Sequence, residues 1–219
     1  MDSKYETGEG GIMAYRVLVV EDQEMPRQLF EIYIQSSEDY ELVDSLSNAS
    51  LAPDICRAGG VDLVLMDVCT ALGASGLEAA ERIKREQPEI KIIIVTSMPE
   101  FSWLDQARRI GVDSFWYKEV QRDTILHVMD QTMAGSRVYP DETPCIPIGK
   151  ATNHDFTDRE LEILRELISG DSNAEIGERL CVSPGTVKRH VENMLKKTGF
   201  HTRTELVAEA GRLGIVIRF

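Results

Sequence analysis

The chain has 219 residues and a formal net charge of -13 at pH 7, which is long for one small domain and ample for two. The charge is uneven: residues 150–219 hold 11 Lys and Arg and 11 Asp and Glu, so the first 149 residues carry the whole acidic excess. This asymmetry excludes a uniformly acidic chain and predicts an acidic domain followed by one able to approach an anion.

The sequence also argues against a membrane-spanning or exported protein and against a structural zinc site. No apolar run approaches the roughly 20 residues needed to cross a bilayer, and the amino terminus lacks a basic-then-apolar signal peptide. The four cysteines are far apart and form no CxxC pair, which is typical of a reduced protein without structural zinc. We therefore expect a cytoplasmic protein without membrane contact, with a disordered lead over residues 1–14 and Met13 as an alternative start.

Five short apolar runs predict strands, and a helical pattern follows each of them. The expected strands are Arg16–Val20, Tyr40–Leu46, Val61–Val68, Ile90–Val95 and Ser114–Tyr117, and the expected helices are Met25–Gln35, Asn48–Ala58, 75–86, 97–110 and Val120–Met133. This alternation predicts an α/β domain over residues 15–135, with a doubly wound, five-stranded parallel sheet.

Four of these strands end in groups suited to phosphoryl and metal chemistry. Glu21 and Asp22 follow the first strand, Asp67 ends the third, Thr96 the fourth and Lys118 the fifth. The carboxyl ends of parallel strands share one edge, where crowded carboxylates suit Mg²⁺ and an Asp can be a nucleophile toward phosphorus. A hydroxyl and an ammonium could hold the phosphoryl oxygens. Each residue alone also fits a turn cap, a loop or the surface, but the four positions together favour a site.

Residues Arg16 to Met133, with these strand ends, resemble the receiver domain of bacterial two-component response regulators. The resemblance implies that Asp67 accepts a phosphoryl group from a histidine kinase in a Mg²⁺-dependent step, after which the surface of the fourth helix and fifth strand rearranges. The implied metal ligands are Glu21, Asp22, Asp67 and the backbone carbonyl of Cys69, and the implied phosphate and switch residues are Thr96, Phe115 and Lys118.

Two features depart from that family. The loop Val68–Gly76 lacks the usual Met-Pro and has one extra residue, and the first metal position is Glu21 in place of the commoner Asp. The Cys69 side chain is expected to line the site, which leaves the phosphate lifetime open.

After a proline-containing stretch, predicted to be an extended linker over residues 136–153, four helices are expected in a domain over residues 154–219. Capping sequences open the helices at Thr157, Ser172, Ser183 and Thr202. The second and third helices, joined by a short turn, have helix-turn-helix spacing.

Basic side chains gather on the third of these helices, outside the positions that must face a small core. Charge alone also fits a solvated amphipathic face, but the helix-turn-helix spacing favours DNA. The runs Thr157–Leu164, Asn173–Ile176 and Ser183–Val191 are similar to the DNA-binding domain of the NarL/LuxR family, and the similarity extends over Phe156 to Ala210. The family reading places Lys188 and Arg189 at base edges, Thr186, Lys196, Lys197 and Arg203 at phosphates, and Glu192 either at a cytosine amino group or as a group that weakens binding.

The two resemblances together predict a cytoplasmic NarL/LuxR-type response regulator. Phosphorylation of Asp67 is expected to promote a dimer that binds paired half-sites. The expected partners are promoter DNA, a sensor histidine kinase and a second copy of the chain, with RNA polymerase as a further candidate. The protein is not predicted to be an enzyme beyond its own phosphotransfer and dephosphorylation.

Two alternatives remain open at this point. The first is a regulator of the same fold that works without phosphorylation, which the altered loop after Asp67 favours. The second is an aspartyl-phosphate phosphohydrolase, which would need a second Asp as general acid where Cys69 stands.

Overall fold

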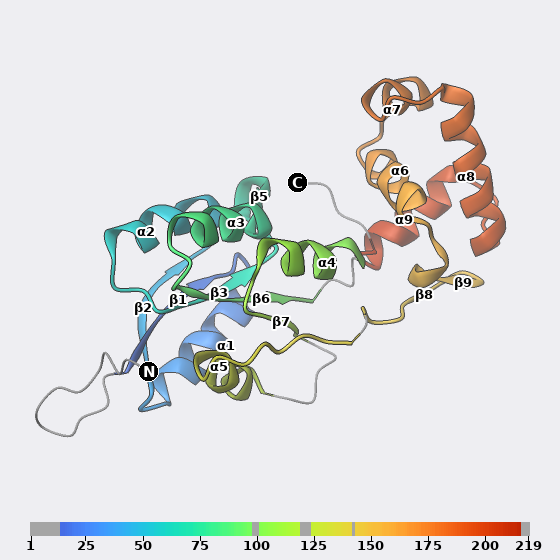
Figure 1. Ribbon diagram of the computed structural model, residues 1–219. Helices are drawn as coiled ribbons and strands as arrows, with labels where there is room; N and C mark the ends of the chain where they lie inside the picture. Colours follow the sequence, from blue (N-terminus) through green and yellow to red (C-terminus); the bar gives the residue numbers. More distant parts are fainter. Residues whose placement is uncertain (1–13, 98–100, 119–123, 142, 216–219) are drawn as a thin grey trace, which may run out of the picture. The chain divides into compact units, whose positions relative to one another are not determined.

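The computed structural model describes residues 14–97, 101–118, 124–141 and 143–215 (Figure 1). The predicted amino-terminal lead and most of the cap predicted at residues 97–100 lie outside these ranges. The chain forms two compact units, and a boundary between them falls between Pro140 and Asp141. None of the helices within the described ranges is long and apolar enough to span a bilayer.

The first unit is built on a five-stranded parallel sheet, as the sequence predicts. Its strands lie in the order β2-β1-β3-β6-β7, and each neighbouring pair is parallel. The strands are β1 (Tyr15–Val20), β2 (Tyr40–Leu46), β3 (Leu63–Asp67), β6 (Lys91–Thr96) and β7 (Ser114–Tyr117). Strand β2 lies on one side of β1, and β3, β6 and β7 follow in turn on its other side. This change of direction at β1 defines the doubly wound topology.

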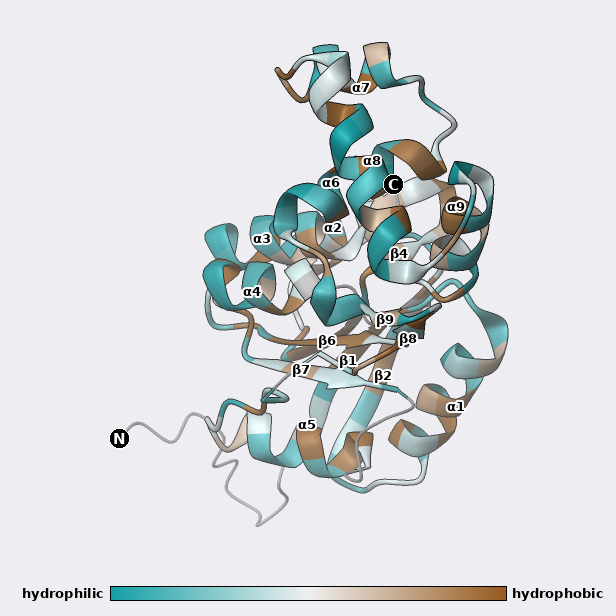
Figure 2. Cartoon of the chain, turned by 90° about the vertical axis from the view of Figure 1, so that its right-hand side faces the viewer, coloured by the Kyte–Doolittle hydropathy of each residue, from teal (hydrophilic) through white to brown (hydrophobic). Residues whose placement is uncertain are grey.

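Helices cover both faces of this sheet. Helices α1 (Glu24–Gln35) and α5 (Ile125–Met133) lie on one side and α2 (Ala52–Ala58) and α3 (Gly76–Glu86) on the other (Figure 1). Consecutive residues of the central strands β1, β3 and β6 are buried. Because strand side chains alternate between the two faces of a sheet, both faces must be covered. In Figure 2, β6 is brown, whereas α3 is largely teal. A fifth helix of this part of the chain, α4 (Phe101–Ile110), precedes β7.

The loop after β3 forms a small hairpin that the sequence does not predict. Strands β4 (Cys69–Thr70) and β5 (Ala74–Ser75) pair antiparallel around a 3₁₀ turn, Ala71–Gly73. Leu72 lies in the turn with φ +62° and is 96% exposed. Two-residue strands are too short to show the alternation by which a strand is recognised.

Two predicted helices differ from the structure at their first turns. The helix predicted from Asn48 begins as a 3₁₀ turn (Ala49–Leu51), because the Asn48 side chain accepts the backbone N–H of Ser50 and Pro53 falls in the first turn of α2. Helix α5 begins at Ile125, after the N-cap Thr124. Residues 120–123 of the predicted fifth helix lie outside the described ranges.

The second unit is a compact set of helices around one core, as predicted. Helices α6 (Asp158–Ile168) and α7 (Asn173–Arg179) have capping boxes formed by the N-caps Thr157 and Ser172. They are followed by α8 (Pro184–Thr198) and α9 (Arg203–Arg212).

The segment predicted to be a linker contains regular structure. Strands β8 (Pro147–Ile148) and β9 (Ala151–Thr152) form a hairpin, followed by a 3₁₀ turn, Asn153–Asp155. Ile148 and Ala151 belong to the hydrophobic core of the second unit. The prolines of this stretch favour an extended linker, and strands of two residues are too short to show an apolar pattern in the sequence.

Candidate functional site

The predicted acidic site forms at the edge of the sheet where β1, β3, β6 and β7 end. The Lys118 ammonium makes an ion pair with the Glu21 carboxylate and lies 3.3 Å from Oδ2 of Asp67. Both carboxylates are buried, and Asp67 is only 4% exposed. Lys118 therefore stabilises two carboxylates that would otherwise repel each other in a weakly polar environment.

Burial and charge shift the protonation equilibrium of Asp67. Burial, followed by the charge of Glu21, raises the pKa of the Asp67 carboxyl to about 7, although Lys118 opposes both effects. The Val68 N–H donates to Oδ1 of Asp67 at 2.8 Å and fixes the orientation of the carboxylate.

The donor atoms at this edge fit a hard divalent cation. Carboxylate oxygens of Glu21, Asp22 and Asp67 all lie within 4.8 Å of one another, with Asp22 exposed and the other two buried. Three carboxylates lie close to the Lys118 ammonium, and a divalent cation would offset their mutual repulsion. Oxygen ligands of this kind, open to water on one side, are the set that Mg²⁺ prefers.

The backbone after Asp67 is tightly constrained. The Gly76 N–H donates to the Val68 carbonyl at 2.8 Å, and a Cβ at Gly76 would lie 1.8 Å from the Asp67 carbonyl oxygen. Only glycine fits this approach between α3 and the end of β3.

The unpredicted hairpin is anchored beside the acidic site. Oγ1 of Thr70 accepts the Ala49 N–H at 2.9 Å and donates to the Ala74 carbonyl at 2.8 Å. Cys69, the position implied to supply a carbonyl to the metal, pairs with Ser75 in this hairpin and is half-buried. The sequence does not predict this hairpin, because its strands of two residues each show no apolar alternation.

The two residues predicted to be switch positions are both buried. The Thr96 carbonyl accepts the Lys118 N–H at 3.0 Å, which places the end of β6 directly beside the acidic site. Phe115 lies further back on β7, with its ring centroid 5.0 Å from that of Tyr117. The structure therefore brings Glu21, Asp67 and Lys118 into contact and connects Phe115 to them through the strand.

Helices α7 and α8 form the predicted helix-turn-helix. The turn between them is tight: the Val182 N–H donates to the Gly177 carbonyl at 2.8 Å, and a Cβ at Gly177 would lie 2.7 Å from the Val182 carbonyl oxygen. On α8, the buried side chains recur on one stripe, Val187, Val191, Met194 and Thr198. The opposite side of α8 is therefore the exposed one.

Most of the predicted DNA-contacting residues of α8 are accessible to solvent, whereas Lys197 and Arg203 have partners within the domain. Lys188, Arg189, Glu192 and Lys196 are exposed, and Lys188 lies 3.8 Å from the carboxylate of Glu192. The half-buried Thr186 is near the N-terminus of α8, where its backbone N–H donates to the N-cap Ser183.

Lys197 and Arg203 are held within the domain. The Lys197 ammonium donates to Oε2 of Glu160 at 2.6 Å and to the Asp155 carbonyl at 2.7 Å. The Arg203 guanidinium donates to the Asn173 side chain at 3.0 Å and to the Asp171 carbonyl. The structure thus gives both cations partners on other segments of the same unit.

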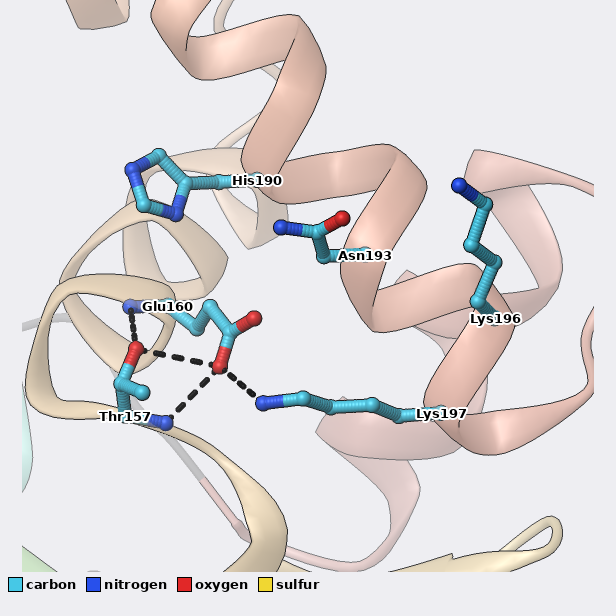
Figure 3. A pocket seen from close by; sticks show the side chains of 6 residues that line it. All are labelled: Thr157, Glu160, His190, Asn193, Lys196 and Lys197. Atoms are coloured by element: carbon cyan, nitrogen blue, oxygen red, sulfur yellow. Dashed lines mark hydrogen bonds and ion pairs between the residues drawn. The ribbon is translucent and has the colours of Figure 1, made fainter.

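Figure 3 shows the Lys197 contact at a hollow of about 410 Å³ beside α8. Lys197 points toward Glu160, whereas its neighbour Lys196 points away. Glu160 is 3% exposed and also accepts the N–H and Oγ1 of Thr157 in the capping box of α6. Burial would raise the pKa of Glu160, but the bonds from Lys197 and Thr157 hold that pKa below its usual value.

An α/β domain with an acidic edge, followed by a helix-turn-helix domain, defines a DNA-binding response regulator. Residues 17–130 match the family model described as response regulator receiver domain, and residues 154–210 match the model described as bacterial regulatory proteins, luxR family. The chain belongs to the LuxR-type response regulators.

Curated relatives match over nearly the whole chain. Response regulator protein VraR of Staphylococcus epidermidis is 32% identical over 203 residues, covering 90% of this chain and 97% of the relative. Fimbriae Z protein of Escherichia coli K12 is 29% identical over 197 residues, covering 87% and 93%.

Solved structures show the same fold at lower identity. A structure of two RcsB dimers bound to two parallel DNAs matches with a TM-score of 0.59 and 15% identity, over 93% of this chain and 100% of that chain. The response regulator ChrA of a heme-sensing two-component system matches with a TM-score of 0.50 and 21% identity, over 93% and 99%.

Proposed function

We propose that Asp67 accepts a phosphoryl group from a sensor histidine kinase and that this modification controls the binding of α8 to promoter DNA. The observation that carries the proposal is the Lys118 ammonium between the buried carboxylates of Glu21 and Asp67. Two buried carboxylates without a cation would destabilise the fold. The Lys118 ammonium lies close to both, where it could also contact the anionic oxygens of a phosphoryl group on Asp67.

In this proposal a carboxylate oxygen of Asp67 forms the bond to phosphorus. The bond from phosphorus to the donor breaks, and its electron pair departs with the donor's leaving group. Lys118 offsets the charge of the incoming phosphoryl oxygens. Glu21, Asp22, Asp67 and the Cys69 carbonyl would hold Mg²⁺, which when bound would offset the negative charge of those oxygens.

The new phosphate changes the edge of the sheet because it adds strong acceptors where Thr96 and Lys118 lie. The Thr96 hydroxyl then turns toward the phosphate, and Phe115 repacks on β7. A second copy of the chain is the proposed partner for dimerisation, because paired half-sites give a small helix-turn-helix module the affinity that a single one lacks.

For DNA, the proposed contacts are those of the exposed face of α8. Lys188 and Arg189 are proposed to reach base edges, and Thr186 and Lys196 to reach phosphates. Glu192, whose carboxylate lies 3.8 Å from the Lys188 ammonium, is proposed either to accept from a cytosine amino group or to weaken DNA binding. The predicted phosphate roles of Lys197 and Arg203 compete with their intramolecular bonds.

The experiment compares DNA binding by the full chain and by Asp67→Ala, each with and without acetyl phosphate and Mg²⁺. The wild type should bind duplex DNA more tightly and as a dimer after treatment, and Asp67→Ala should not respond. An equal gain in both proteins would contradict the proposed mechanism.

A further inference from the structure

The chain that leaves α5 is attached to the free side of β7. The Val138 carbonyl accepts the Phe115 N–H at 2.8 Å, and the Val138 N–H donates to Oγ of Ser114 at 3.1 Å. These two bonds attach Val138 to the edge of the sheet beside β7. The start of the connection to the DNA-binding domain is therefore hydrogen-bonded to the strand that carries Phe115.

Tyr139 is held in this segment by three contacts. Its ring centroid is 6.5 Å from that of Phe115, with 33° between the planes. The guanidinium carbon of Arg108, on α4, lies 5.3 Å from the same Tyr139 ring centroid, a cation–π arrangement. The Tyr139 hydroxyl donates to the Val112 carbonyl at 2.7 Å. Burial raises the pKa of Tyr139 to about 12, so the phenol remains a donor at neutral pH.

Arg108 also contacts the next residue of the segment, since its guanidinium donates to the Pro140 carbonyl at 3.4 Å. One side chain of α4 thus contacts both the ring and the backbone of residues 139–140. We name the set Arg108, Phe115 and Tyr139 the linker latch.

A continuous row of contacts joins the latch to the acceptor site. The Phe115 ring packs against both the Tyr139 ring, at a centroid distance of 6.5 Å, and the Tyr117 ring, at 5.0 Å. Tyr117 is followed directly by Lys118, whose ammonium lies 3.3 Å from Asp67. A rotation of the Phe115 ring or a shift of α4 must change the contacts of Tyr139, because Tyr139 lies against both.

We propose that the linker latch couples the start of the interdomain connection to the acceptor site, so that modification of Asp67 loosens residues 138–140 from β7. The coupling to Asp67 rests on the proposed function, whereas the latch itself does not. Its physical basis is a two-state packing arrangement in which one aromatic ring bridges two elements.

Hydrogen exchange of the full chain tests this, with the amides of Phe115 and Val138 as reporters because both amides are bonded within the latch segment. Tyr139→Leu should speed their exchange about tenfold, because it removes the aromatic contact, the cation–π contact and the hydrogen bond to the Val112 carbonyl. Tyr33→Leu, at an exposed tyrosine of α1, is the matched control and should leave both amides unchanged. Tyr139→Phe keeps both ring contacts and loses only the hydrogen bond to the Val112 carbonyl, so its exchange should be slower than that of Tyr139→Leu.

Two perturbations of the switch face complete the test. Phe115→Leu should speed exchange at Val138 without any phosphodonor, while the β1 amides, which report global opening, stay protected. Phosphorylation of the wild type, verified by intact mass, should speed the same reporters, and Tyr139→Leu should show no further response.

Each outcome decides a separate point. Unchanged reporters in phosphorylated wild type would overturn the coupling, although Asp67 had been modified. Absence of an adduct would count against the proposed function alone, and the Phe115→Leu and Tyr139→Leu arms would still decide whether the latch exists. Unchanged exchange in both of those variants would overturn it.

Discussion

Replacing Lys197 by Met should destabilise the second domain without removing a phosphate contact. The substitution removes the ammonium that lies 2.6 Å from the Glu160 carboxylate, which is 3% exposed. Breaking a buried ion pair costs about 3–5 kcal/mol. Here the Lys197 side chain is itself 33% exposed, and Glu160 keeps its two bonds from Thr157. We therefore expect a loss of about 2 kcal/mol.

The neighbouring residue supplies a matched control. Lys196 is exposed, points away from Glu160 (Figure 3) and makes no ion pair within the part of the chain that the structure describes. Lys196→Met removes the same charge from the same helix and should change stability by less than about 0.5 kcal/mol.

Two assays on the full chain separate the roles. Hydrogen exchange of the α6 and α8 amides should be about thirtyfold faster in Lys197→Met, which is the equivalent of about 2 kcal/mol, and unchanged in Lys196→Met. The salt dependence of binding to a random-sequence duplex should change in Lys196→Met and stay at the wild-type value in Lys197→Met. Loss of one phosphate contact reduces the slope of log K against log salt by about 0.9. We expect that reduction in Lys196→Met and not in Lys197→Met.

The reasoning would be refuted if Lys197→Met lost the same slope as Lys196→Met while its exchange rates stayed at the wild-type values. That result would place Lys197 on a phosphate, as the resemblance to the NarL/LuxR family implies, and would make its bond to Glu160 dispensable.

Three further predictions follow from the same geometry. Gly76→Ala should lower the free energy of unfolding by more than about 2 kcal/mol and slow phosphoryl transfer, because a Cβ would lie 1.8 Å from the Asp67 carbonyl oxygen. The control is Gly185→Ala, whose Cβ would lie 3.7 Å from Oγ of Ser183. Equal melting temperatures for the two variants would contradict the close approach at Gly76. Lys118→Met should cost about 3 kcal/mol in urea unfolding, because two buried carboxylates lose their cation, and Mg²⁺ should recover part of the loss; a variant as stable as the wild type would show that the ion pairs contribute little. The pKa of Glu160 is lower in the folded protein than in the unfolded chain, so its carboxylate stabilises the protein at pH values above the unfolded pKa of about 4.3, and this stabilisation is lost as the pH falls through the folded pKa. Glu160→Gln should therefore lose less stability than the wild type between about pH 5 and pH 3. The same pH dependence of stability in both proteins would contradict the assignment.

The sheet and the helices of the second domain could be predicted because their signals are local. Apolar runs such as Leu63–Met66 are buried on both faces, and capping residues such as Thr157 and Ser172 mark helix starts at the positions where the structure has them. The carboxylates and Lys118 could be predicted to meet, because parallel strands end at a common edge.

Other features depend on contacts between distant residues and could not be predicted. The partners of Lys197 and Arg203 lie on segments 30 or more residues away in the chain, and a basic residue on a basic helix gives no sign that it is paired. The hairpin at Cys69–Ser75 and the Tyr139 contact with Phe115 likewise arise from tertiary packing of short segments without periodic pattern.

The most direct test of the central claim is the intact mass of the purified chain after incubation with acetyl phosphate and Mg²⁺, with Asp67→Ala beside it. We predict a single phosphoryl adduct on the wild type, dependent on Mg²⁺, and none on Asp67→Ala. An adduct of equal extent on both proteins would place the acceptor elsewhere. No adduct even with a cognate kinase, under conditions that modify a control receiver, would instead identify a regulator that works without phosphorylation.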